Sequence, residues 1–199
     1  ENIRGILLNI DNLSSGMAST EEIRNALLNF KEQSGKFIYS YSETYSQSAY
    51  YLSSVADEVF LYPTGMLDFR GLGVELMFFK GAIDKLGIDV QIIRGSNNKF
   101  KSAVEPFLYS QMSDENREQV MTYLNSLWSN MLSNIKSSRN ISIEQMNEIA
   151  DSIHIRNASS AVEFQLVDRL IYEDELHSFL KTKTDTPDDD ELNLVSFSK

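Results

Sequence analysis

The sequence predicts an α/β fold in which a parallel β-sheet is covered by helices. From residue 3 to residue 94, apolar runs of strand length alternate with amphipathic runs of helical length. Parallel strands need long crossover connections, and helices are the usual ones. With 199 residues, 42% of them hydrophobic, the chain is long enough for one well-buried domain.

The elements of this first part are bounded by capping and helix-breaking residues. Ser19 and Thr20 precede two glutamates, as at a helix N-terminus, and Gly35 and Gly87 stand where helices are expected to end. Pro63 is expected to end a strand. The expected helices are 20–33, 46–56 and 74–87. The expected strands are 3–10, 35–43, 56–63 and 89–94.

From residue 113 the pattern becomes helical. A long amphipathic helix is expected at 113–139, with Trp128 in the core, followed by helices at 141–152 and 159–170. The acidic segment 182–191 is typical of a solvated linker, and 192–199 reads as the strand-like start of a connection. We therefore expect a single α/β domain over 1–199 with a C-terminal helical region.

Composition excludes several classes of function. The net charge of −11 repels phosphates, so a nucleic-acid role is not expected. The chain has no cysteine, which excludes disulfides and thiolate catalysis. No apolar run approaches the roughly 18 residues of a membrane-spanning helix, and no signal-peptide pattern is present. Because the chain opens directly into a strand without an initiating methionine, we expect an excised piece of a longer protein, with any anchor outside it.

Several familiar motifs are absent or incomplete. The segment GLGVEL at 71–76 lacks the third glycine of a dinucleotide-binding loop. His154 and His177 follow no zinc pattern, lie far along the chain from the sheet, and have no glycine-flanked serine beside them. The acidic run 188–191 lacks the spacing of a calcium loop. We expect no metal and no cofactor.

Lys101 is the candidate catalytic residue. It follows the expected strand 89–94 and a polar Gly-Ser-Asn-Asn loop, and it precedes a short helix expected to begin near Ser102. Strand ends that run into loops are common places for chemistry in α/β folds. A helix N-terminus disfavours an ammonium ion, and burial would lower the pKa of a lysine further. Glu105, four residues on, would act in the opposite direction.

The surrounding residues resemble a known family. The run FKSAVEPF at 100–107 agrees at seven of eight positions with the Tyr-Lys-Ser-Ala-Val-Glu-Pro-Phe motif of the long-form signal peptide peptidases, or protease IV. The segments 45–71 and 166–170 resemble the same family, so the likeness covers most of the chain. The resemblance implies a ClpP- and crotonase-like spiral of βαβ units.

In the long members of that family, an N-terminal half carries a lysine base and a C-terminal half carries the serine nucleophile. This chain resembles the N-terminal half. The family's nucleophile segment, Ala-Ala-Ser-Gly-Gly-Tyr, aligns with 45–50 and places Gln47 at the position of the serine, which makes that position vestigial. A shift of one residue would place Ser46 or Ser48 there instead, but neither keeps the glycine context.

The resemblance also implies partners and a location. We expect a serine from the other half to be activated by Lys101, apolar peptides such as signal-peptide remnants as substrates, and a homo-oligomer, which is a tetramer in the long members. Residues 66, 67 and 69 (Met66, Leu67 and Phe69) are candidates for part of an apolar groove. The expected location is the bacterial inner membrane, with this domain on the periplasmic side. Two alternatives stay open: a non-catalytic crotonase-like scaffold for oligomerisation, and a crotonase-type acyl-CoA enzyme, which the acidic composition disfavours.

Overall fold

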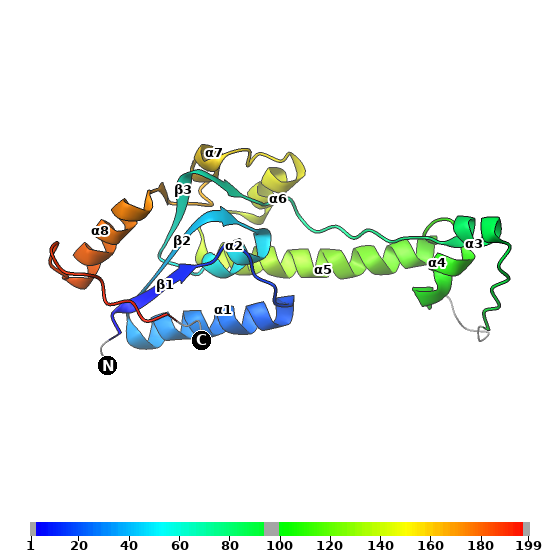
Figure 1. Cartoon of the computed structure of the whole chain (residues 1–199), viewed down its shortest axis with the longest axis horizontal. Helices are drawn as coiled ribbons and strands as arrows, with labels where there is room; N and C mark the ends of the chain where they lie inside the picture. The colour runs from blue at the N-terminus through cyan, green and yellow to red at the C-terminus, as the bar shows by residue number, and fades with distance from the viewer. Residues whose placement is uncertain (1–2, 94–99, 197–199) are drawn as a thin grey trace. The chain divides into compact units, whose positions relative to one another are not determined.

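The computed structural model describes residues 3–93 and 100–196, and it divides into two compact units (Figure 1). Unit 1 consists of Glu1–Arg70 and Leu132–Lys199, and unit 2 of Gly71–Met131. The single domain expected over 1–199 stays a prediction.

The sheet of unit 1 confirms the predicted α/β class, consistent with a ClpP- and crotonase-like fold. Its four strands are β1 (Gly5–Asn9), β2 (Phe37–Tyr45), β3 (Glu58–Leu67) and β4 (Arg169–Leu170). They are all parallel and lie in the order β1-β2-β3-β4. The first three strands are therefore sequential neighbours joined by helical crossovers, as the alternating pattern predicted.

Strand β3 is longer than predicted, because Pro63 does not end it. The pairing of β2 with β3 is irregular: Ser42 pairs with Leu61, but Thr44 pairs with Met66. Proline has no N–H for the ladder and is tolerated at such a bulge. Gly65 lies in the same irregular stretch, where an added Cβ would lie 2.3 Å from the carbonyl oxygen of Glu43.

Helices cover both faces of this sheet. The long helix α1 (Met17–Ser34) and the short helix α2 (Gln47–Ser53) provide the first two crossovers. Gly35 ends α1 in the left-handed conformation, at φ 64°, as the sequence predicted. On the other face, α8 (Glu173–Thr184) packs its Leu176 and Leu180 onto Tyr39, Tyr41 and Phe60 of the sheet.

The C-terminal part of unit 1 differs from the prediction in three places. Helices α6 (Ile143–Asp151) and α7 (Ala158–Glu163) form, but the helix expected at 159–170 ends early. Gln165 has a φ of 62°, a conformation that a helix cannot continue through. The chain then enters β4. Further on, α8 runs into the expected linker 182–191, and the described residues 192–196 form no strand.

Unit 2 is built from short elements and the first part of a long helix. These are α3 (Lys80–Leu86), the 3-10 turn η1 (Ser102–Val104), α4 (Glu105–Leu108) and α5 (Asp114–Ser138), the last of which continues into unit 1. The helix expected at 74–87 forms only as α3, and no strand forms over the described residues 89–93. Trp128 is half-buried rather than a core residue.

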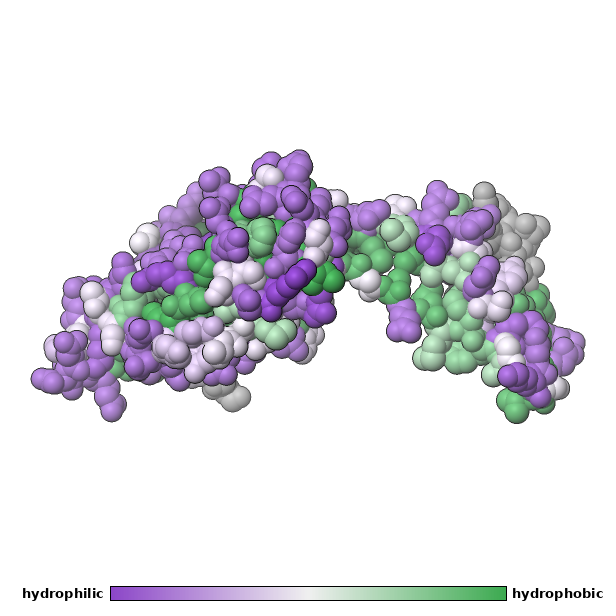
Figure 2. Space-filling model, turned by 90° about the horizontal axis from the view of Figure 1, so that it is seen from above, coloured by the Kyte–Doolittle hydropathy of each residue, from purple (hydrophilic) through white to green (hydrophobic). Residues whose placement is uncertain are grey.

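The full helix expected at 74–87 and the strand expected from residue 89 did not form, because the apolar side chains of 71–93 do not enter a core. Val74, Met77, Leu86 and Ile93 are all exposed, and α3 has no buried residue. A strand of a parallel sheet needs burial on both faces, which this segment lacks. The space-filling view shows apolar surface on the part of the molecule that carries α3 and α4 (Figure 2). Among the residues that the structure describes, no helix is long and apolar enough to cross a membrane.

Candidate active site

The position predicted for a vestigial nucleophile lies at the carboxyl end of β2. Gln47 is the first residue of α2, and only Ser46 separates it from the last residue of the strand. Such strand-to-helix junctions are where parallel α/β sheets place functional side chains. The residue at this junction is an amide, which has no ionisable proton to give up as a nucleophile.

Both serines beside Gln47 take part in bonds that build the turn. The Ser46 hydroxyl caps α2 by accepting the N–H of Ala49 at 3.3 Å. The Ser48 hydroxyl donates to the carbonyl oxygen of Leu13 at 3.2 Å. The two hydroxyls lie 3.3 Å apart. This arrangement is explained by local structure, as expected for an N-cap and a polar tether.

The side chain of Gln47 joins the ends of two neighbouring strands. Its Oε1 accepts the backbone N–H of Arg70 at 3.0 Å. Close by, the N–H of Asp68 donates to the carbonyl oxygen of Tyr45 at 2.8 Å. The hydrogen bond and charge of Asp68 raise the pKa of the Arg70 guanidinium. Gln47 thus has an observed structural role, holding the chain where it leaves β3.

The suggested apolar groove at 66–69 is not formed by these residues. Leu67 is 3% exposed and Phe69 is 1% exposed. The Phe69 ring packs edge-on against Tyr50, with centroids 5.9 Å apart. Both side chains are core, so that prediction was wrong for them. Met66, at 57% exposed, is the one member of the three that faces solvent.

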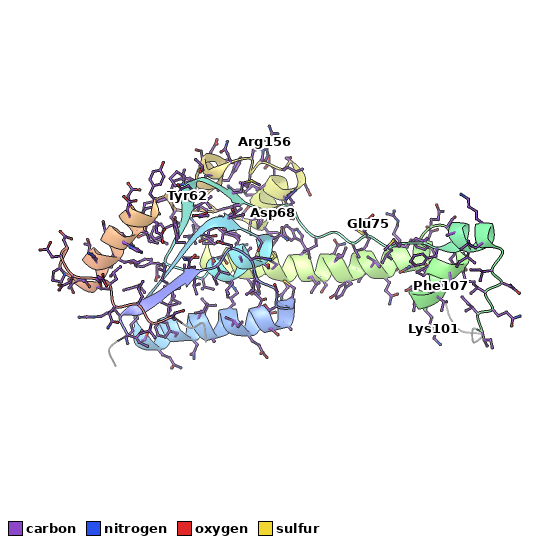
Figure 3. All side chains as sticks on the ribbon, in the orientation of Figure 1. Tyr62, Asp68, Glu75, Lys101, Phe107 and Arg156 are labelled. Atoms are coloured by element: carbon purple, nitrogen blue, oxygen red, sulfur yellow. The ribbon has the colours of Figure 1, made fainter. Side chains whose placement is uncertain are left out.

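Lys101 lies in unit 2, on an exposed stretch directly before η1. The predicted short helix begins at Ser102 as the 3-10 turn η1, which runs directly into α4, but Lys101 itself is exposed within this chain. The polar loop expected before it falls in 94–99, outside the described residues. Figure 3 labels Lys101 and Phe107, which bracket most of the FKSAVEPF segment.

The rest of the FKSAVEPF segment is held firmly within unit 2. The backbone N–H of Phe79 donates to the carbonyl oxygen of Pro106 at 2.7 Å. The rings of Phe79 and Phe107 stack with centroids 5.8 Å apart. Glu105 is 4% exposed and accepts hydrogen bonds from Ser113 and Asn116. Sequence reasoning missed this network, although a glutamate shortly before a Ser-Asp-Glu-Asn helix start is a usable signal.

The two histidines lie far along the sequence from both Gln47 and Lys101. His154 stacks on Phe164 with ring centroids 5.0 Å apart, and His177 is exposed on α8. The glycine-containing segment 71–76 is followed by irregular chain rather than directly by a helix. Within the described residues, no group of three or more histidine, aspartate or glutamate side chains is placed to hold a metal ion.

The parallel sheet covered by helices makes this an α/β chain, consistent with a ClpP- and crotonase-like fold. Comparison with known families agrees. Peptidase family S49 matches residues 30–186, and the chain belongs to this family.

Three curated relatives support the assignment. The chain is 36% identical over 140 residues to "Protease 4" of Haemophilus influenzae, covering 70% of this chain and 22% of that protein. It is 34% identical over 177 residues to "Protease 4" of Salmonella typhi, covering 85% and 28%. It is 32% identical over 197 residues to "Serine protease SPPA, chloroplastic" of Arabidopsis thaliana, covering 99% and 28%. The chain thus spans between a fifth and a third of the length of these relatives.

Proposed function

We propose that this chain is the base-bearing N-terminal half of a long-form S49 serine endopeptidase that degrades cleaved signal peptides. Lys101 acts as the general base, and the serine comes from the C-terminal half of the same protein or from a neighbouring subunit. The observation that carries the proposal is the lysine motif at 100–107, and it is supported by Gln47, an amide, at the strand-to-helix junction that aligns with the family's nucleophile segment.

The chemistry follows from a serine–lysine pair. Neutral Lys101 Nζ takes the proton from the incoming serine hydroxyl as the serine oxygen attacks the scissile carbonyl. The protonated amine then gives its proton to the leaving nitrogen, and an acyl-enzyme remains. Water, activated in the same way, releases the acid and restores the serine. Backbone amides beside that serine stabilise the oxyanion, so this contribution comes mostly from outside the chain.

The position of Lys101 supports a partner from outside the chain. A lysine acting as a base at neutral pH needs a lowered pKa, and desolvation is a main way to achieve it. Lys101 is exposed within this chain, so its burial depends on an added surface. The serine-bearing half supplies that surface in our proposal. A homo-oligomer, which is a tetramer in the long members of the family, would bring the halves of several copies together.

The surface of unit 2 supports an apolar peptide as the substrate. An open depression of about 480 Å³ follows α4 and is lined in part by Leu108, Tyr109 and Met112. Phe100 and Phe107 of the lysine segment are also exposed, at 51% and 43%. An inner-membrane location with a periplasmic domain, anchored by a segment outside this chain, is part of the same proposal.

The test is to express the complete gene and compare the wild type with Lys101→Ala on an apolar peptide ester. We expect the variant to lose activity by about 10²–10⁴-fold, the usual contribution of a general base. Lys136→Ala is the matched control, because Lys136 is exposed on α5. Undiminished hydrolysis by a folded Lys101→Ala enzyme would falsify the assignment of the base.

The isolated chain provides a second arm of the test. We expect it to show no peptidase activity, since Gln47 cannot act as the nucleophile. Cleavage by the isolated chain that is lost in Ser46→Ala or Ser48→Ala would show that a flanking serine is the nucleophile. If the complete protein folds and assembles but Lys101→Ala changes nothing, the chain is a non-catalytic scaffold.

A further inference from the structure

Glu105 is a buried charged side chain for which the proposed reaction has no use. Only 4% of its surface is exposed. Its carboxylate accepts hydrogen bonds from two described residues: from the Ser113 hydroxyl at 2.6 Å, from the Ser113 backbone N–H at 3.2 Å, and from the Asn116 side-chain amide at 2.8 Å. Burying a carboxylate is costly unless donors compensate it, so this network is a defined structural feature.

All three donors belong to the start of α5. Ser113 is the N-cap of that helix: its hydroxyl accepts the N–H of Asn116 at 3.1 Å, and its carbonyl oxygen accepts the N–H of Arg117 at 2.9 Å. The N-terminus of a helix carries a partial positive charge and unpaired N–H groups, both of which favour an anion. The hydrogen bonds of Glu105 therefore connect the FKSAVEPF segment to the first turn of α5, a helix of 25 residues.

The hydrogen-bonded Glu105 side chain is an anchor for this segment, and the 3-10 turn η1 connects it to Lys101. Lys101 is the N-cap of η1 and Glu105 is its C-cap, with the Glu105 N–H donating to the carbonyl oxygen of Ser102. A second anchor follows at once, where the Phe79 N–H donates to the carbonyl oxygen of Pro106. The backbone that carries the lysine is thus fixed at the residue where its short turn ends.

The geometry points to Glu105 as a positioning residue for the general base, acting through the backbone between 101 and 105 rather than on the substrate. This inference rests on the proposed role of Lys101. A misplacement of about 1 Å in a catalytic group can lower the rate by about 10²-fold, even when the change lies outside the reacting groups. Loss of the Glu105 anchor should therefore lower kcat while leaving KM nearly unchanged.

The experiment uses the complete gene product and an apolar peptide ester as the substrate. Glu105→Gln keeps the shape of the side chain but removes the charge and turns an amide NH₂ toward the donors of α5. We expect kcat to fall about 10- to 100-fold, with KM within about twofold of the wild type. Glu118→Gln is the matched control, since Glu118 is exposed on the same helix. It should keep the wild-type kcat.

A readout independent of activity accompanies the kinetics. Hydrogen exchange of the backbone amides in 100–113 should quicken in Glu105→Gln and stay unchanged in Glu118→Gln, because only the first variant weakens the anchor. If Glu105→Gln fails to fold, Asn116→Ala replaces it. That variant removes one donor of the three and should lower kcat in the same direction by a smaller factor.

The outcomes separate this inference from the proposed function. A folded Glu105→Gln or Asn116→Ala enzyme with the wild-type kcat overturns the positioning role, provided that Lys101→Ala is inactive in the same assay. A raised KM with an unchanged kcat also overturns it, since that result would place Glu105 in substrate binding. If Lys101→Ala itself keeps the wild-type activity, the proposed function fails first and the positioning role fails with it.

Discussion

Arg24 shows how a single buried charge can organise three helices of unit 1. It is 1% exposed, on α1. Its guanidinium donates to the Tyr51 carbonyl oxygen at 3.2 Å and the Ser54 hydroxyl at 3.0 Å, at the end of α2. It also donates to the Asn134 carbonyl oxygen and the Ser138 hydroxyl in the last turn of α5. Burial lowers the pKa of Arg24 from its ordinary value.

Replacing Arg24 should therefore destabilise the fold more than a change of surface charge would. Arg24→Met fills a similar volume but removes the charged donor that links α1 to the ends of α2 and α5, while the carbonyl oxygens of Tyr51 and Asn134 keep the hydroxyls of Ser54 and Ser137 as donors. A hydrogen bond from a charged group contributes about 1.5–3 kcal/mol, so we expect the free energy of unfolding to fall by about 3 kcal/mol. Denaturant unfolding of the isolated chain measures it. Arg156→Met, at an exposed position, should stay within about 0.5 kcal/mol of the wild type.

At the scale of the element, α2 is the most enclosed helix of unit 1. Residues 49–53 are all buried, and the Tyr50 ring packs edge-on against both Tyr45 and Phe69. Burial raises the pKa of Tyr45, although hydrogen bonds to its hydroxyl act the other way. Burial likewise raises the pKa of Tyr50. Both phenols therefore stay protonated in the folded chain at pH values where an unfolded chain ionises them.

This difference predicts alkaline destabilisation with a definite sign. Above a pH of about 10 the unfolded chain loses protons that the folded chain keeps, so the free energy of unfolding falls as pH rises, by about 1.4 kcal/mol per pH unit for each such group. Tyr50→Phe removes one group, and its slope between about pH 10 and 11 should be shallower by that amount. Denaturant titrations at several pH values measure the slope. The exposed Tyr123→Phe should keep the wild-type slope, and equal slopes in all three proteins would contradict the prediction.

The elements that the sequence predicted well are those whose apolar residues form the sheet of unit 1 or pack against it. Strands β1, β2 and β3, helix α1 and its Gly35 cap all have local signals that agree with their burial. The β4 strand was missed because it has two residues, and because the positive φ of Gln165 is not encoded by a glycine.

The candidate site was predictable to different degrees at its different positions. The strand-to-helix junction at Gln47 follows from the alternating pattern of strands and helices. The role of Lys101 rests on the resemblance of its motif, since the physical signal of a lone lysine is weak. The Glu105 network was missed, because the periodic pattern of apolar residues does not report the pairing of Glu105 with the cap of the next long helix, and the local signal at residues 113–116 was not used.

At the scale of the whole molecule, the two units differ in how much of their chain is protected. Unit 1 contains the sheet and nearly all of the buried apolar side chains, whereas the stretch 71–79 in unit 2 has no helix or strand. Val74 is 51% exposed and Met77 is 73% exposed. Segments with few buried contacts open at a low free energy, and proteases cut such segments first.

We therefore expect limited proteolysis of the isolated chain to begin within 71–79. A protease that cuts before large apolar side chains should cleave there while β1, β2 and β3 stay intact, since cutting those strands requires the sheet to open. Mass spectrometry of the first fragments identifies the site. A variant with serine at 74, 76 and 77 removes three of the favoured side chains and leaves those at 72, 78 and 79, so it should slow the first cut while leaving the denaturant unfolding of unit 1 unchanged. A first cut within 5–9 or 37–45 would show that the sheet, and not unit 2, is the least protected part of the chain.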